Sequence, residues 1–191
     1  MPTDADKSAA LMLEDAIATT ASLKPFLHQV VTLSDLVLRC FENKKKLLFC
    51  GNGGSASDAN HIAAEFTGRF NRERAPYPAL ALSADAGLLT CTANDYGFDE
   101  IFSRPIQAHG EASDILFCLT TSGNSANILA ALAAARAKGI YSVALLGKGG
   151  GACKGVADEE FIIASNVTAR IQEAHKLILH MICELVDCEL A

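Results

Sequence analysis

Residues 46–66 read KLLFCGNGGSASDANHIAAEF, in which an apolar run, a glycine-rich turn and a helical pattern follow one another directly. Short apolar runs like the one at 46–51 recur at 78–84, 114–121, 141–147 and 159–165. Helical patterns separate and follow them, at 55–70, about 98–109, 125–138, 151–157 and about 168–190. The runs are continuously apolar instead of alternating, so we expect both faces of the sheet to be covered. The pattern therefore predicts an α/β fold with a parallel sheet between helical layers.

The segment before the first apolar run is helical in pattern. Apolar residues recur at helical spacing from residue 7 to about 42, and Pro25 interrupts them, which predicts two helices or one broken helix. A chain of 191 residues fits a single domain, and no linker or repeat divides it. We therefore expect one domain over 1–191, with the helical segment 1–42 packing on that domain or on a neighbouring subunit.

Charge and cysteine usage restrict the partners and the compartment. The net charge of −6 argues against a nucleic-acid surface, which requires clustered basic residues. We see neither a signal-peptide layout nor an apolar stretch near the roughly 20 residues of a membrane span, so no membrane partner is expected. The seven cysteines form no CxxC pair and several lie in apolar runs, which indicates reduced thiols and a cytoplasmic protein.

Three loops near predicted strand ends carry small and polar residues suited to ligand binding: 52–55, 92–97 and 120–125. The third, TTSGNS, places several hydroxyls at the start of a helix, where the dipole favours an anion. Its simpler interpretation is a helix cap, for which Ser125 alone would suffice. Three consecutive hydroxyl residues exceed that need, so we predict a phosphate site. Neither glycine-containing loop matches GxxxxGK[ST] or GxGxxG, so nucleotides are not indicated.

The helix after the first glycine turn carries His61 and Glu65 on one face, four residues apart. This spacing fits a metal-binding pair, a general base with its partner, or an exposed surface pair. The last helical segment contains Gln172, His175 and His180. His180 lies in an apolar stretch, so it is either a hydrogen-bonded core residue or an acid tuned by a nearby carboxylate. Residue types alone leave these alternatives open.

Five motifs in order then resemble one family. CGNGGSASDANHIAAEF, TANDYGF, FSRPIQAHG, TTSGNSANI and TARIQEAH are similar to those of the phosphoheptose isomerases, which belong to the sugar isomerase (SIS) domain family. The resemblance implies a flavodoxin-like three-layer sandwich around a five-stranded parallel sheet. It also implies a homotetramer with active sites at subunit contacts. The implied reaction converts sedoheptulose 7-phosphate to D-glycero-D-manno-heptose 7-phosphate through an enediol, as the first step toward activated heptose for lipopolysaccharide core or other surface glycans.

The same resemblance implies roles for individual residues. Glu65 is expected to be the catalytic base and His180 the acid. The expected substrate-binding residues are Asn52, Gly53, Gly54, Ser55, Glu65, Asn94, Asp95, Thr120, Thr121, Ser122, Ser125 and Gln172. One zinc ion per subunit is expected on His61, Glu65, Gln172 and His180.

Helix geometry limits that metal set. Eight residues of ideal helix rise about 12 Å, so Gln172 and His180 can share an ion only if the helix starts late, bends, or carries converging side chains. Glu65 cannot ligate zinc tightly and remain a fully free base, so the role of the metal is left open.

Two other functions are compatible with this fold. One is a non-enzymatic SIS protein that binds a replication initiator, although such relatives tend to lose the active-site carboxylate and the second histidine. This chain retains Glu65, His180 and the complete TTSGNS loop. The other is an isomerase of a different phosphosugar, which would use the same residues.

Overall fold

The computed structural model describes residues 3–190, so residues 1, 2 and 191 of the expected domain lie outside the described residues. The strands run β1 (Leu47–Gly51), β2 (Ala79–Ala81), β3 (Ile115–Thr120), β4 (Tyr141–Leu146) and β5 (Glu159–Ile162). They form one sheet in the order β2-β1-β3-β4-β5, and every neighbouring pair is parallel. The predicted five-stranded parallel sheet is confirmed, although β2 is shorter than the apolar run at 78–84.

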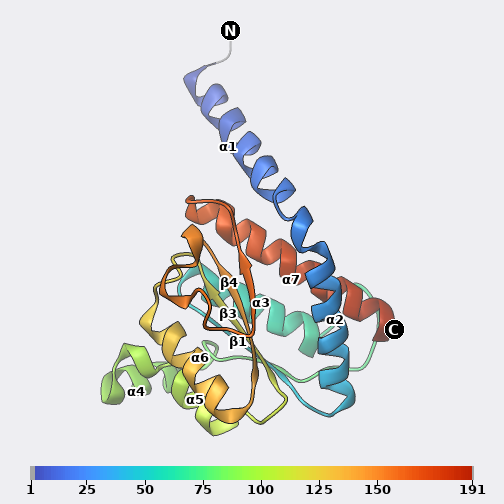
Figure 1. Ribbon diagram of the computed structural model, residues 1–191, viewed down its shortest axis with the longest axis vertical. Coiled ribbons are helices and arrows are strands. Elements are labelled where there is room, and N and C mark those ends of the chain that lie inside the picture. The colour runs from blue at the N-terminus through green and yellow to red at the C-terminus, as the bar shows by residue number, and fades with distance from the viewer. Residues whose placement is uncertain (1–2, 191) are drawn as a thin grey trace.

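Helices cover both faces of this sheet (Figure 1). One layer consists of α2 (Leu27–Glu42), α3 (Gly54–Thr67) and α7 (Thr168–Leu190), and the other is formed mainly by α5 (Ser103–His109) and α6 (Ala126–Lys138). Alternate residues of β1 serve the two layers: Leu47 and Phe49 belong to the first core, whereas Leu48 and Cys50 belong to the second. This double burial explains why the strands are apolar throughout, and the result is the predicted three-layer sandwich.

The N-terminal segment forms two helices joined by a short 3-10 turn. The first helix, α1 (Asp4–Ala21), ends before the turn Lys24–Phe26, where Pro25 lies, and α2 follows. Figure 1 shows α1 projecting away from the rest of the chain toward the N-terminus. Leu11, Met12, Leu13 and Ile17 are exposed along it. No helix within residues 3–190 combines the length and apolarity needed to cross a bilayer.

Two local expectations are wrong. The predicted loop 92–97 lies mostly within helix α4 (Ala86–Tyr96), whose first turn is capped by the Asp85 side chain and which ends at Gly97 with φ +99°. Asp85 supplies the N-cap that the sequence interpretation overlooked. Conversely, the helix predicted at 151–157 is absent from the described chain. A 3-10 segment at Lys148–Cys153 overlaps the start of this region, and turns follow it. Gly149, Gly150 and Gly151 all have positive φ, which an α-helix does not allow.

The strand order reverses its direction between the loops that follow β1 and β3, and this switch point is called the crevice below. The chain passes from β1 outward to β2 and then returns to β3 on the other side of β1. Ligands of such sheets bind beyond the carboxyl ends of the strands where the winding direction reverses. Gly51 at the end of β1 pairs with Leu119 near the end of β3. The loops 52–55 and 121–125 therefore open side by side at the same edge of the sheet.

Candidate active site

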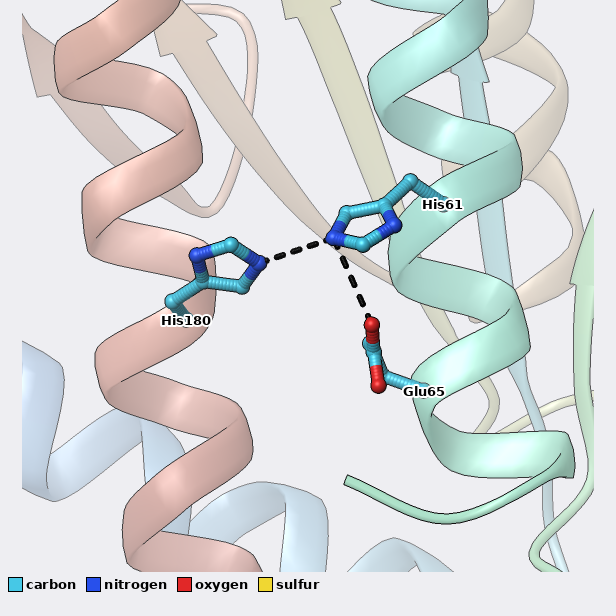
Figure 2. Close-up of side chains that lie close together, drawn as sticks. All are labelled: His61, Glu65 and His180. Atoms are coloured by element: carbon cyan, nitrogen blue, oxygen red, sulfur yellow. Dashed lines mark hydrogen bonds and ion pairs between the residues drawn. The ribbon is translucent and has the colours of Figure 1, made fainter. Parts of the chain in front are cut away.

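Helices α3 and α7 bring three titratable side chains together (Figure 2). The Nε2 atom of His61 lies 3.4 Å from a carboxylate oxygen of Glu65 and 2.9 Å from Nε2 of His180. One ligand atom from each residue lies within 4.8 Å of the others. His61 and Glu65 come from successive turns of α3, as their spacing predicts, and His180 approaches from α7. His61 remains partly accessible, so the cluster can be reached from solvent.

His180 occupies a setting that the sequence left undecided. Its ring meets His61 edge to face, with centroids 5.1 Å apart, and stacks on Phe70 with centroids 5.7 Å apart. Burial lowers the pKa of His180, and the neighbouring His61 lowers it further. At neutral pH this imidazole is therefore neutral, with one nitrogen able to accept a proton and the other able to donate one. His180 is partly exposed and contacts His61, so it is not an isolated core histidine, and its role as an acid stays a prediction.

The loop after β3 gathers hydroxyls around the start of α6. Thr120 Oγ1 lies 3.3 Å from Ser122 Oγ and 3.1 Å from Ser125 Oγ. Although Ser125 occupies the N-cap position of α6, its side chain makes no capping hydrogen bond. The interpretation of Ser125 as a helix cap is therefore wrong, and its hydroxyl instead contacts that of Thr120. Hydroxyls and a helix N-terminus together suit a phosphate group.

Gly123 brings the loop 120–125 into close contact with the main chain of Gly150. Gly123 has φ +66°, and a Cβ there would overlap the carbonyl of Gly150. The main chain of Cys153 donates to the Gly123 carbonyl at 2.9 Å, and Ala152 N–H donates to Asn124 Oδ1 at the same distance. The triple-glycine segment 149–151 thus packs against the predicted phosphate loop, and only glycine fits at 123.

The glycine turn after β1 is tied to that loop. Asn52 and Asn127 exchange two side-chain amide hydrogen bonds, each 2.9 Å long, across the crevice. Gly53 has φ +56°, which turns the chain into α3, and Ser55 is buried in the first turn of that helix. A Cβ on Gly54 would overlap the side-chain amide of Gln172. The loops 52–55 and 120–125 and the start of α7 therefore form one contiguous region.

Three predicted residues lie apart from the histidine cluster. Gln172 contacts Gly54, and because α7 is helical from Thr168 it lies about 12 Å along the axis from His180. Asn94 and Asp95 lie on α4, where the Asn94 amide donates to Asp95 Oδ1 at 2.7 Å. In Figure 1, α4 lies on the side of the sheet that α5 and α6 cover, opposite α3 and α7. The roles expected for these three residues stay predictions.

Comparison with known proteins identifies the family. A family model described as the SIS domain matches residues 14–147. The chain is 49% identical over 173 residues to the phosphoheptose isomerase of Citrifermentans bemidjiense, an alignment covering 91% of this chain and 88% of that protein. A phosphoheptose isomerase structure from Francisella tularensis superposes with a TM-score of 0.91 at 36% identity, over 98% of this chain and 100% of that one. One from Neisseria gonorrhoeae gives 0.87 at 39%, over 97% and 100%. The chain belongs to the phosphoheptose isomerase family.

Two residues around the site of this phosphoheptose isomerase family member were not predicted from the sequence. Asn127 is buried against Asn52, and Phe70 stacks on His180. A polar residue in the first turn of an otherwise alanine-rich helix was a usable signal for Asn127. Nothing in the sequence marked Phe70, because its partner lies 110 residues away and meets it only through packing of the segment after α3 against α7.

Proposed function

We propose that the protein is an aldose–ketose isomerase that converts sedoheptulose 7-phosphate to D-glycero-D-manno-heptose 7-phosphate. This reaction begins the synthesis of activated heptose for lipopolysaccharide core or other surface glycans. The observation that carries the proposal is the cluster of His61, Glu65 and His180. The first two residues lie on α3, which starts at the same crevice as the hydroxyl loop, and His180 comes from α7. Relatives that share about half of the sequence and carry the name phosphoheptose isomerase support it.

The substrate's shape suits this arrangement. The phosphate is on carbon 7, whereas the proton transfers occur at carbons 1 and 2, so the two ends of an extended sugar need separate sites. Thr120, Thr121, Ser122 and Ser125 would hold the phosphate, with a further contact from Ser55. Asn52, Gly53 and Gly54 would contact the sugar, because the turn exposes backbone there.

The proposed chemistry uses two side chains. Glu65 is partly buried and, as a carboxylate, would remove the proton from the carbon beside the carbonyl to form a cis-enediol. His180, a neutral imidazole, would protonate the oxygen on carbon 2 and then take the proton from the oxygen on carbon 1. The protonated Glu65 would return its proton to carbon 2, which completes the move of the carbonyl from carbon 2 to carbon 1 and restores both side chains. His61 contacts both and would hold them at a fixed separation.

A zinc ion fits the same cluster. Two imidazole nitrogens and one carboxylate oxygen are ligands that zinc accepts, and three protein ligands leave a position for substrate or water. We propose His61, Glu65 and His180 as ligands, with Gln172 as a fourth only if its side chain is brought to them. While it ligates an ion, Glu65 is not a free base, so a bound ion would orient the substrate, support the fold or inhibit the reaction.

The protein is proposed to act as a homotetramer of single-domain chains, each SIS domain spanning residues 1–191, in the cytoplasm. The exposed apolar residues of α1 support association, since α1 projects without a covering element in one chain (Figure 1). Asn94 and Asp95, which lie on the opposite side of the sheet from His61, would reach a site of another copy. Five buried free thiols are typical of a reducing compartment.

The proposal is tested by incubating the protein with sedoheptulose 7-phosphate and following aldose formation by NMR. Conversion is expected, and its absence with the folded protein would overturn the proposal. Other ketose phosphates assayed in parallel distinguish a different phosphosugar isomerase, because such an enzyme would convert one of them faster than the heptulose. A protein that converts none of them would fit the non-enzymatic alternative.

A further inference from the structure

Arg74 and Asp187 form an ion pair that is almost completely withdrawn from solvent. Arg74 Nε lies 2.8 Å from Asp187 Oδ1, and the side chains are 3% and 2% exposed. Arg74 belongs to the segment 68–78, which follows α3 and leads into β2, whereas Asp187 lies on α7, seven residues beyond His180. The pair thus connects the two helices that carry the proposed catalytic cluster.

The remaining nitrogens of Arg74 bind the end of α3. One terminal nitrogen donates to the carbonyl of Glu65 at 2.7 Å, and the other donates to the carbonyl of Phe66 at 3.0 Å. Both carbonyls lie in the last turn of α3, where carbonyl groups have no hydrogen-bond partner within the helix. The partial negative charge at this end of the helix favours a cation such as Arg74. The main chain of Glu65, whose side chain is the proposed base, is therefore held directly by Arg74.

Asp187 binds the other side of the same segment. One of its oxygens accepts the main-chain N–H groups of Asn71 and Arg72, at 3.1 and 2.8 Å. Phe70, immediately before them, stacks its ring on His180 with 28° between the planes. The Asp187 carboxylate thus holds residues 70–72 against α7, and Phe70 in this segment packs on the His180 ring.

We propose that Arg74 and Asp187 are positioning residues that set the separation of α3 and α7 and, through Phe70, the orientation of His180. This inference rests on the proposed function, since it assigns a purpose to the geometry of Glu65, His61 and His180. The cluster is divided between two helices, so its geometry depends on how α3 and α7 lie against each other. A shift of about 1 Å between reacting groups lowers rates by about 10²-fold, so such a clamp matters to catalysis as well as to folding.

The competing interpretation is an ordinary buried ion pair that stabilises the fold alone. The Lys46–Asp114 pair offers a matched control, because its nitrogen and oxygen lie 2.9 Å apart and Asp114 is fully buried. It lies just before β1 and β3, at the edge of the sheet opposite the crevice. Loss of this pair is expected to lower stability without altering the contacts between α3 and α7.

The test compares the double variant Arg74→Met/Asp187→Asn with Asp114→Asn. The double variant removes both buried charges together, and asparagine keeps an oxygen for the two N–H groups, so it avoids an unpaired buried charge. Circular dichroism and denaturation first establish a temperature at which both variants are folded. At that temperature, kcat of the double variant is expected to fall by about 10- to 100-fold with KM within about threefold. The control is expected to keep kcat within about twofold.

A second readout does not depend on activity. The ring signals of His180, followed by NMR of imidazole-labelled protein, are expected to shift in the double variant and in Phe70→Leu but not in Asp114→Asn. Unchanged His180 signals together with an unchanged kcat would overturn the proposal, as would equal losses of kcat in the control. If the unaltered protein converts no sugar phosphate, the proposed function fails, whereas the NMR comparison still tests the clamp.

Discussion

The Nε2 atoms of His61 and His180 lie 2.9 Å apart, although 119 positions separate the two residues in the sequence. Two imidazole nitrogens at this distance must have a proton or a cation between them, because two lone pairs facing each other would repel. One ring nitrogen can therefore donate to the other, and a carboxylate oxygen of Glu65 lies 3.4 Å from the same nitrogen of His61. The three side chains form one unit of directly contacting groups.

Substitution of the proposed base tests that unit. Glu65→Gln keeps the size of the side chain but removes its ability to take a proton, so kcat is expected to fall by about 10²- to 10⁴-fold. Conversion of sedoheptulose 7-phosphate followed by NMR measures it. Glu73→Gln, which neutralises an exposed carboxylate, is the matched control and should retain full activity. Equal activity of the Glu65→Gln variant and the parent would remove Glu65 as the base.

Ser125→Ala distinguishes phosphate binding from helix capping. A capping serine contributes about 1 kcal/mol to stability. Since the Ser125 side chain makes no capping bond, the free energy of unfolding should change by less than about 0.5 kcal/mol. Loss of a charge-assisted hydrogen bond to phosphate should raise KM about tenfold. Urea denaturation and steady-state kinetics measure the two effects. A stability loss without a change in KM would restore the capping interpretation.

Metal content tests the cluster as a zinc site. After incubation with zinc and removal of the excess, the protein should retain about one ion per chain. His61→Ala removes one of the three ligands and should reduce the retained zinc to near background. His109→Ala, at an exposed position at the end of α5, should leave it unchanged. Elemental analysis by mass spectrometry gives the ratio. Zinc retained equally by both variants would place the ion elsewhere.

His175 predicts a loss of stability in acid. Its side chain is fully buried, and this burial lowers its pKa from 6.5 to about 4. Below pH 6.5 the His175 side chain of the unfolded chain binds a proton, whereas that of the folded chain stays unprotonated down to about pH 4. Stability therefore falls across that range, by roughly 3 kcal/mol at most. In His175→Leu, the unfolding free energy should fall less between pH 7 and pH 4.5, whereas exposed His28→Gln should behave as the parent does. Identical pH profiles for all three proteins would exclude this contribution.

The exposed side chains of α1 predict an effect on assembly. Leu13 and Ile17 lie on one face of this helix, four residues apart, and both are exposed in the single chain. Leu13→Asp with Ile17→Asp should shift a tetramer toward smaller species, as measured by light scattering after size exclusion. Glu14→Gln on the same helix should not. A parent protein that is already monomeric would contradict the proposed tetramer.

Local patterns were sufficient to predict most of the fold. Continuous apolar runs such as 47–50 predicted strands buried on both sides, and the core on each face of the sheet confirms them. The errors came from short-range chemistry that was overlooked. Asp85 caps a helix where a loop was expected, and three successive glycines at 149–151 replace a helix with a 3-10 turn.

The sequence by itself determined what depends on neighbours along the chain: the elements, their order, and the pairing of His61 with Glu65 on one helix face. The tertiary structure alone decided which distant groups meet. His180 reaches His61, Asn127 binds Asn52, and Arg74 pairs with Asp187 because the crossovers place α3, α6 and α7 at definite positions on the sheet. These contacts follow from how helices pack over a buried sheet, and helical spacing within one segment carries no information about them.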